Sequence, residues 1–344
     1  MTRFRTFYLA AILVAFNAPA MAALSGDMSG AENPRLAWLE RFQDSRQGPE
    51  QTETFSGTYT LGDDGSLDLN HISGDIRVMT GRGNEVKIDA IKRVRHRDPA
   101  EAKRLLSALR IEVAQIGGRI EVRTSYPRVT RGFNGSVDYT ISVPQNAAVS
   151  LKTVSGDVSV NGVRGEVRAE SISGDVDAVG TPNLALAKTV SGDVRARDIA
   201  SASLTLGTVS GTVVASGLKV RTLDASSVSG DLQLSNLQVE RLTAKTLSGV
   251  IAFDGSLARG GRYEFNAHSG DVRLMLTSNT PGFELDASTF SGSVRSDFPV
   301  TLRSNNGAAG RRGTATRAIR GTYGDASAIL ALRSFSGNVV ITKR

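Results

Sequence analysis

Thr153-Val154-Ser155-Gly156-Asp157-Val158 is the stretch that decides the fold, because close copies of it recur through the second half of the chain. The glycine of its Ser-Gly pair returns at intervals of 18, 18, 19, 19, 19, 21 and 22 residues, at Gly174, Gly192, Gly211, Gly230, Gly249, Gly270 and Gly292. A further copy stands at Gly337 and an isolated one at Gly74. Repeats of this length are typical of solenoids, in which each unit buries its apolar side against the next unit.

The apolar residues around each glycine indicate two short strands per repeat. The seventh and fifth residues before the glycine, such as Leu204 and Leu206, are mostly apolar and share one side of a strand because they are two residues apart. The second residue before and the second after, such as Val209 and Val213, are also apolar, and we expect both to face the core together with the glycine. The two sets can both face inward only if the chain changes phase between them. We therefore predict a bend or bulge at the Thr or Ser three residues before the glycine.

These patterns predict an all-β fold whose main part, residues 146–344, is a parallel β-solenoid (β-helix) of 18–22-residue rungs with an insertion at about 303–320. Residues 52–145 are predicted to form a small α/β-like lead-in of strands with one helix. Asp98 can cap that helix, Pro99 suits its first turn, and Glu101 completes a capping box. Apolar residues then recur on one helix face, which we expect to lie against the sheet: Ala102, Leu105, Leu106 and Leu109.

The first residues predict export. In residues 1–22, Arg3 and Arg5 supply a positive start, residues 7–16 an apolar core, and Ala20-Met21-Ala22 a cleavage site, which together indicate a signal peptide. A flexible leader is predicted over residues 23–51, with a short amphipathic helix at about 34–43. No later stretch is long and apolar enough to span a membrane. We expect an exported protein, periplasmic or at the cell surface, without a transmembrane segment in the mature chain.

The charge distribution indicates where a ligand could bind. The chain has a net charge of +7, and residues 82–131 hold 13 Lys or Arg against 6 Asp or Glu. Two clusters are candidate binding sites: Lys92, Arg93, Arg95 and Arg97, and, in the predicted insertion, Arg311, Arg312, Arg317 and Arg320. An exported basic face meets anionic lipid, lipopolysaccharide or acidic polysaccharide before nucleic acid. These are the partners we expect, with an envelope protein as the alternative and no nucleic acid.

Neither a metal nor catalysis is expected. The residue after the repeat glycine is Asp157, Asp175 and Asp193 in three successive copies, which could suggest calcium, but Thr212 and Val250 interrupt the series. An Asp at such a turn can instead accept hydrogen bonds from nearby backbone amides. The chain has no cysteine, and its three histidines, His71, His96 and His268, are far apart in sequence. His268 occupies an otherwise apolar position, so we interpret it as a core histidine, and we predict no cofactor and no enzyme activity.

The repeats also carry a family resemblance. The matching stretches are residues 84–93, residues 139–144, the copies of residues 153–158, and residues 320–324. Over about residues 52–344 the chain resembles the bacterial "putative adhesin" family of unknown function with β-strand (Ser-Gly-Asp-Val) repeats. The resemblance implies a β-helical fold and a cell-envelope setting, and it implies no catalytic residues.

Three functions stay open at this point. The first is adhesion, scaffolding or binding of an envelope polymer. The second is an envelope-stress or regulatory accessory that docks on a membrane protein. The third, which the connections of only a few residues between strands disfavour, is an enzyme that acts on polysaccharide.

Overall fold

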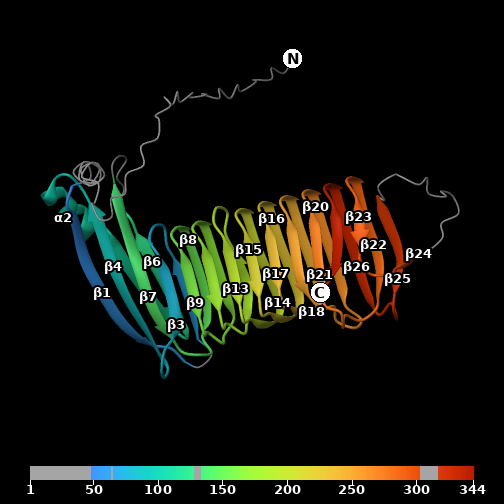
Figure 1. Ribbon diagram of the computed structural model, residues 1–344. Coiled ribbons are helices and arrows are strands. Elements are labelled where there is room, and N and C mark those ends of the chain that lie inside the picture. The colour runs from blue at the N-terminus through green and yellow to red at the C-terminus, as the bar shows by residue number, and fades with distance from the viewer. Residues whose placement is uncertain (1–47, 63–64, 128–132, 303–316) are drawn as a thin grey trace, which may run out of the picture. The chain divides into compact units, whose positions relative to one another are not determined.

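Two long sheets, stacked strand by strand, form the part of the chain that the computed structural model describes, residues 48–62, 65–127, 133–302 and 317–344 (Figure 1). The described residues belong to one compact unit. The predicted signal peptide (1–22), the predicted helix at 34–43, and Arg311 and Arg312 lie outside them. Within the described ranges, no helix is long and apolar enough to cross a membrane.

The first sheet runs in the spatial order β1 (Glu50–Thr60), β4 (Glu85–Arg95), β7 (Asn134–Val143), β3 (Ile76–Thr80), β9 (Val158–Asn161), β11 (Val176–Val179), β13 (Val194–Arg197), β15 (Val213–Ser216), β17 (Leu232–Ser235), β19 (Ile251–Gly255), β21 (Val272–Leu276), β27 (Val339–Lys343) and β23 (Val294–Ser296).

The second sheet runs in the spatial order β24 (Thr301–Leu302), β25 (Ala318–Tyr323), β22 (Phe283–Ser291), β26 (Ala328–Ser336), β20 (Arg262–Ser269), β18 (Gln238–Ser248), β16 (Lys219–Ser229), β14 (Ala200–Ser210), β12 (Leu184–Lys188), β10 (Val167–Ser173), β8 (Ala148–Ser155), β2 (Ser66–Asn70), β6 (Arg119–Ser125) and β5 (Arg110–Ile116).

Each repeat is one rung of a parallel β-solenoid, as the glycine spacing predicts. The residues before the glycine form a strand of the second sheet, and those after it form a strand of the first sheet. Pairing is parallel and in register from rung to rung, so that Val194 lies opposite Val213 and Leu204 opposite Leu223. The core fills the space between the sheets and includes the positions seven and five before the glycine and two after it, such as Leu204, Leu206 and Val213. In one rung a register shift buries Leu184 in place of Ala185.

The chain changes phase at the glycine, and the bend predicted three residues earlier was wrong. The Thr or Ser three residues before the glycine continues the inward alternation of the strand and is buried. Thr189, Thr208 and Thr246 are examples. The residue between this Thr or Ser and the serine, which we expected in the core, is exposed in each repeat. The glycine makes this phase change because its φ is positive, +145° at Gly192, where residues with a side chain are strained.

The last two strands are inserted into the stack out of sequence order. β26 lies between β20 and β22, and β27 lies between β21 and β23. The chain therefore forms its outermost rung with β22 and β23, turns back through β24 and β25, and ends in the rung beneath. β25 pairs antiparallel with β22 and with β24, and Phe283, Phe298 and Tyr323 pack together at this end. In the sequence Gly337 follows Gly292, but in the stack the rung of Gly337 lies between the rungs of Gly270 and Gly292.

The other end of the solenoid holds the single helix of the described residues, α2 (Pro99–Ala108). Asp98 Oδ1 accepts a hydrogen bond from Ala100 N at 2.9 Å, and the four predicted apolar residues are buried. Glu101 does not close a capping box, since its carboxylate accepts hydrogen bonds from Arg104 at 2.8 and 2.5 Å. Strands β2 and β3 pair with β8 and β9, which continues both sheets into the residues before the first regular repeat.

Candidate functional site

One row of exposed side chains, apolar except for one histidine, runs along the second sheet, with one member from each rung. We call it the outer row; each member stands two residues before the rung glycine, and in spatial order they are Ile72, Val154, Ile172, Val190, Val209, Val228, Leu247, His268, Phe335 and Phe290. The exposed fraction of its aliphatic and Phe members ranges from 43% at Val154 to 66% at Phe290. Ten rungs at about 4.8 Å per step make the row roughly 40 Å long. On ordinary protein surfaces, exposed apolar side chains are scattered singly. A continuous row of them marks a candidate interaction site.

The aromatic end of the outer row exists because the last rung is inserted. β26 brings Phe335 between His268 and Phe290, with ring centroids 4.9 Å and 4.8 Å apart and nearly parallel planes. The prediction that His268 is a core histidine was therefore wrong: the side chain is exposed and stacks on Phe335.

A second row, rich in cations, borders the first. It comprises the residues four before each glycine, namely Asn70, Lys152, Glu170, Lys188, Gly207, Ser226, Lys245, Asn266, Arg333 and Ser288. Lys152 Nζ lies 3.5 Å from Glu170 Oε1. Among the described residues, no carboxylate pairs with Lys188, Lys245 or Arg333.

The surface between the two rows is hollowed in two places, which together we call the outer groove. One hollow, of about 530 Å³, lies along Val154, Ile172, Val190 and Val209 with Lys152 and Lys188 beside them. The other, of about 720 Å³, lies along Leu247, His268, Phe335 and Phe290 with Lys245 and Arg333 beside them. Each hollow thus has an apolar wall and a wall that carries cations, and in the first hollow the second wall also includes Glu170, the partner of Lys152.

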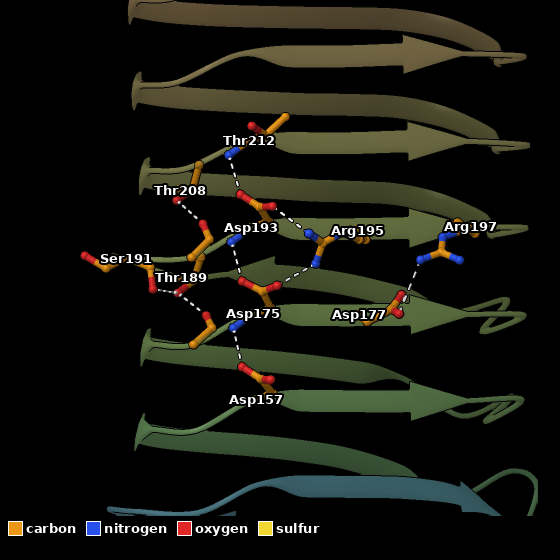
Figure 2. A network of polar contacts seen from close by, with 12 residues as sticks. Asp157, Asp175, Asp177, Thr189, Ser191, Asp193, Arg195, Arg197, Thr208 and Thr212 are labelled. Carbon is orange, nitrogen blue, oxygen red and sulfur yellow. Dashed lines mark hydrogen bonds and ion pairs between the residues drawn. The ribbon is translucent and has the colours of Figure 1, made fainter. Parts of the chain in front are cut away.

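Buried hydroxyl groups hold the floor of the groove in place. Oγ1 of Thr189 donates to the carbonyl oxygen of Gly174 at 2.8 Å, and Thr208 donates to Gly192 at 2.9 Å (Figure 2). Because each bond joins one rung to the rung before it, the hydroxyls fix the inward direction of this position. The residue that follows, a member of the outer row, is thereby directed outward.

The aspartates after the glycines satisfy backbone amides of the next rung (Figure 2). Asp157 Oδ1 accepts from Asp175 N at 2.8 Å, Asp175 Oδ1 from Asp193 N at 2.8 Å, and Asp193 Oδ1 from Thr212 N at 2.9 Å. Arg195 bridges Asp175 and Asp193 at 2.6 Å each. Although partial burial opposes it, hydrogen bonds from Arg195 and the Asp193 amide lower the pKa of Asp175. No group of three metal-ligating side chains occurs among the described residues. These aspartates, which we call the aspartate ladder, hold the backbone of consecutive rungs together.

Three of the four cations predicted as the first binding cluster, Lys92, Arg93 and Arg95, are paired with acidic residues. Lys92 is 7% exposed, and its Nζ lies 2.6 Å from Glu53 Oε1 and donates to the carbonyl oxygen of Leu109 at 3.2 Å. Arg93 pairs with Asp138, and Arg95 Nε donates to Glu50 Oε2 at 2.7 Å. Arg97 is exposed and has an interaction partner. Burial makes Lys92 the least accessible member of this cluster.

The second predicted cluster is only partly described. Arg317 is exposed, and its backbone carbonyl accepts a hydrogen bond from Thr289 N at 2.8 Å. Arg320 lies in β25 and donates through Nε to Asp286 Oδ1 at 2.9 Å. Ligand binding by either cluster remains a prediction.

Sequence reasoning missed the outer row because we took apolar character as a sign of inward orientation. A signal was present. Strict alternation from the seventh residue before the glycine puts the Thr or Ser inward and its apolar neighbour outward. Ser and Thr recur on both sides of that neighbour, which is typical of a position that does not belong to a continuous apolar core.

The chain belongs to the family described as Toastrack DUF4097, whose model matches residues 65–342. No curated protein matches the sequence significantly. Among solved structures, the chain is similar to a "putative lipid binding protein" from Parabacteroides distasonis, at 12% identity over 85% of this chain and 97% of that one, with a TM-score of 0.42. It is also similar to a "putative adhesin" from Bacteroides fragilis, at 15% identity over 85% and 97% of the two chains, with a TM-score of 0.38. At these identities and TM-scores, neither a partner nor a function is transferred.

Proposed function

We propose that this protein is a non-enzymatic binding protein of the cell envelope, which holds an anionic envelope component in the outer groove. The observation that carries the proposal is the unbroken outer row beside cations that lack carboxylate partners among the described residues. An apolar surface of this kind is kept exposed at a cost in solubility, which a binding role explains. The predicted signal peptide and the family resemblance support export to the periplasm or cell surface.

The open shape of the groove supports binding over catalysis. Hydrolysis of a polymer needs an acid and a base converging on one bond inside a cleft. Here the rows bring together apolar and cationic side chains, and Glu170, the one carboxylate in the rows, is paired with Lys152. The ladder carboxylates accept backbone amide hydrogen bonds. His71 and His268 belong to rungs at opposite ends of the stack, so they do not converge.

The experiment compares two cation variants of the exported chain. One carries Lys188→Ser, Lys245→Ser and Arg333→Ser, and the control carries Arg95→Ser and Arg97→Ser from the predicted cluster. Each is tested for co-sedimentation with anionic phospholipid vesicles, lipopolysaccharide and an acidic polysaccharide. We expect the groove variant to lose binding to at least one probe, more strongly at low salt, and the control to keep it. The reverse result would assign binding to the first basic cluster, and failure of all three probes would refute the proposed function.

A further inference from the structure

We propose that the outer groove takes individual anionic lipids, one in each hollow, with an acyl chain along the apolar wall and the phosphate against the cationic wall. This inference rests on the proposed function and names the ligand of the same surface. It depends on the length of the hollows, on the charges of their walls and on the orientation of the aromatic rings.

The length of each hollow fits one acyl chain. The first hollow follows four rungs, from Val154 to Val209, and the second follows four rungs, from Leu247 to Phe290. Three steps of about 4.8 Å give roughly 14 Å. One leaflet of a bilayer's hydrocarbon core is about 15 Å thick, which is the extent of an acyl chain in a membrane. Each hollow can therefore cover most of one chain.

The charges select an anionic head group. In the first hollow Glu170 is paired with Lys152, which leaves Lys188 without a described carboxylate partner. In the second hollow neither Lys245 nor Arg333 has such a partner. The Lys188 side chain extends toward the next rung, since a Cβ at Gly207 would lie 3.5 Å from Lys188 Cγ and 3.6 Å from its Cε. An ammonium or guanidinium group beside an apolar wall complements a phosphate attached to a hydrocarbon chain.

The aromatic end favours an acyl chain over a sugar. The rings of His268, Phe335 and Phe290 face one another along the row, with interplanar angles of 5° and 3°. The stacked faces are therefore turned toward neighbouring rungs, and ring edges are presented to the groove. Sugar recognition by aromatic residues relies on an open ring face, whereas a flexible hydrocarbon packs against edges and aliphatic side chains alike.

The test uses single-chain lipids below their micelle concentration, with native mass spectrometry and calorimetry as readouts. The probes are lysophosphatidylglycerol, which is anionic, and lysophosphatidylcholine with the same acyl chain, which is zwitterionic. We expect up to two lysophosphatidylglycerol molecules per protein, affinity that rises with acyl length, and binding at least tenfold weaker for lysophosphatidylcholine.

Two variants divide the groove. Ile172→Ser, Val190→Ser and Val209→Ser alter the first hollow, and Leu247→Ser, Phe335→Ser and Phe290→Ser alter the second. Each should reduce the number of bound lipids from two to one. Met79→Ser with Ile91→Ser is the control, since these residues are 44% and 40% exposed on the first sheet, away from the groove, and should leave two. Unfolding curves establish that each variant is folded.

The outcomes separate this inference from the proposed function. Binding to vesicles or lipopolysaccharide without binding of monomeric lysolipid would overturn the lipid proposal and leave the proposed function standing. Lysolipid binding that neither groove variant weakens would also overturn it. If the groove variants instead break up a dimer of the protein, the outer row is an interface between two copies and the lipid proposal fails.

Discussion

Among single residues, the rung glycine is the one whose replacement the structure penalises most clearly. Gly192 has a φ of +145°, and a Cβ there would lie 2.3 Å from the carbonyl oxygen of Gly174. Backbone strain alone predicts that Gly192→Ala lowers the free energy of unfolding by about 1 to 3 kcal/mol, and the clash should add to this loss. Gly180→Ala is the matched control, because Gly180 has a φ of +59° but open space around it. Urea unfolding of the two variants would refute this account if their losses were equal.

His71 predicts a pH dependence of stability. It occupies the position that Thr or Ser holds in every other rung except that of Ala267, and it is 5% exposed. Burial lowers its pKa to about 4. The unfolded chain binds a proton to this residue near pH 6.5 while the folded chain does not, so stability should fall as the pH drops from about 6.5 to 4. The full effect is about 3 kcal/mol, from roughly 1.4 kcal/mol per pKa unit. His71→Gln should remove this part of the slope in urea unfolding, and His96→Gln should retain it.

Lys92 is expected to stabilise the end of the helix. Its ammonium donates to the carbonyl of Leu109, the C-cap residue of α2, and pairs with Glu53 in β1. Lys92→Ser should lower the free energy of unfolding by roughly 1.5 to 3 kcal/mol, the range for a hydrogen bond to a charged group. Arg82→Ser, at an exposed position, should change it by less than about 0.5 kcal/mol. Unchanged stability of the Lys92 variant would show that Lys92 does not stabilise the end of α2.

Among structural elements, the aspartate ladder joins consecutive rungs by hydrogen bonds from backbone amides to aspartate side chains. The amide of Asn338 donates to Asp271 Oδ1 at 2.8 Å, and this bond, followed by the contact with Arg273, lowers the pKa of Asp271. A carboxyl whose pKa is lower in the folded chain stabilises it above the unfolded pKa of about 4, and this contribution is lost as the pH falls through the folded value. The contact between Asp271 and the Asn338 amide therefore resists mild acid and weakens in strong acid.

The variant Asp271→Asn tests this role of the ladder. It retains the oxygen that accepts the Asn338 amide but cannot titrate, so its stability should vary less than that of the wild type between about pH 4 and pH 2. Asp224→Asn, an exposed position outside the ladder, should keep the wild-type dependence. Thermal melts across this pH range give the comparison, and parallel curves for Asp271→Asn and the wild type would contradict the assigned role.

In the molecule as a whole, the out-of-order C-terminal rung holds the outermost rung. β26 and β27 are the only described strands between the rung of β20 and β21 and the rung of β22 and β23. Deletion of residues 326–344 should leave β22 and β23 without their parallel partners, and β24 and β25, which pair antiparallel, would then be joined only to β22. The rungs before β20 keep both neighbours. Shortening the chain further, to residue 277, should restore a compact product, because the stack then ends at β21.

Limited proteolysis distinguishes the two truncations. In the first truncation, cleavage within residues 280–302 and 317–323 should be faster than in the full chain, and the second truncation lacks these residues. Equal protection of residues 280–302 and 317–323 in the full chain and in the first truncation would mean that the last rung does not stabilise them.

The sequence by itself determined that the chain is a solenoid, that its rungs repeat with the spacing of the Ser-Gly pairs, and that a helix capped by Asp98 precedes the regular repeats. These features follow from patterns that are local in sequence, namely the spacing of successive glycines, the alternation of apolar residues within a strand and the residues that cap a helix. Only the tertiary structure decided which apolar residues face water, because the phase of the second strand depends on the φ that Gly192 and its equivalents adopt against the neighbouring carbonyl. The insertion of Phe335 between His268 and Phe290 and the burial of Lys92 also depend on pairing between segments far apart in sequence. No pattern within a single repeat encodes such pairing, because its energy comes from contacts between rungs.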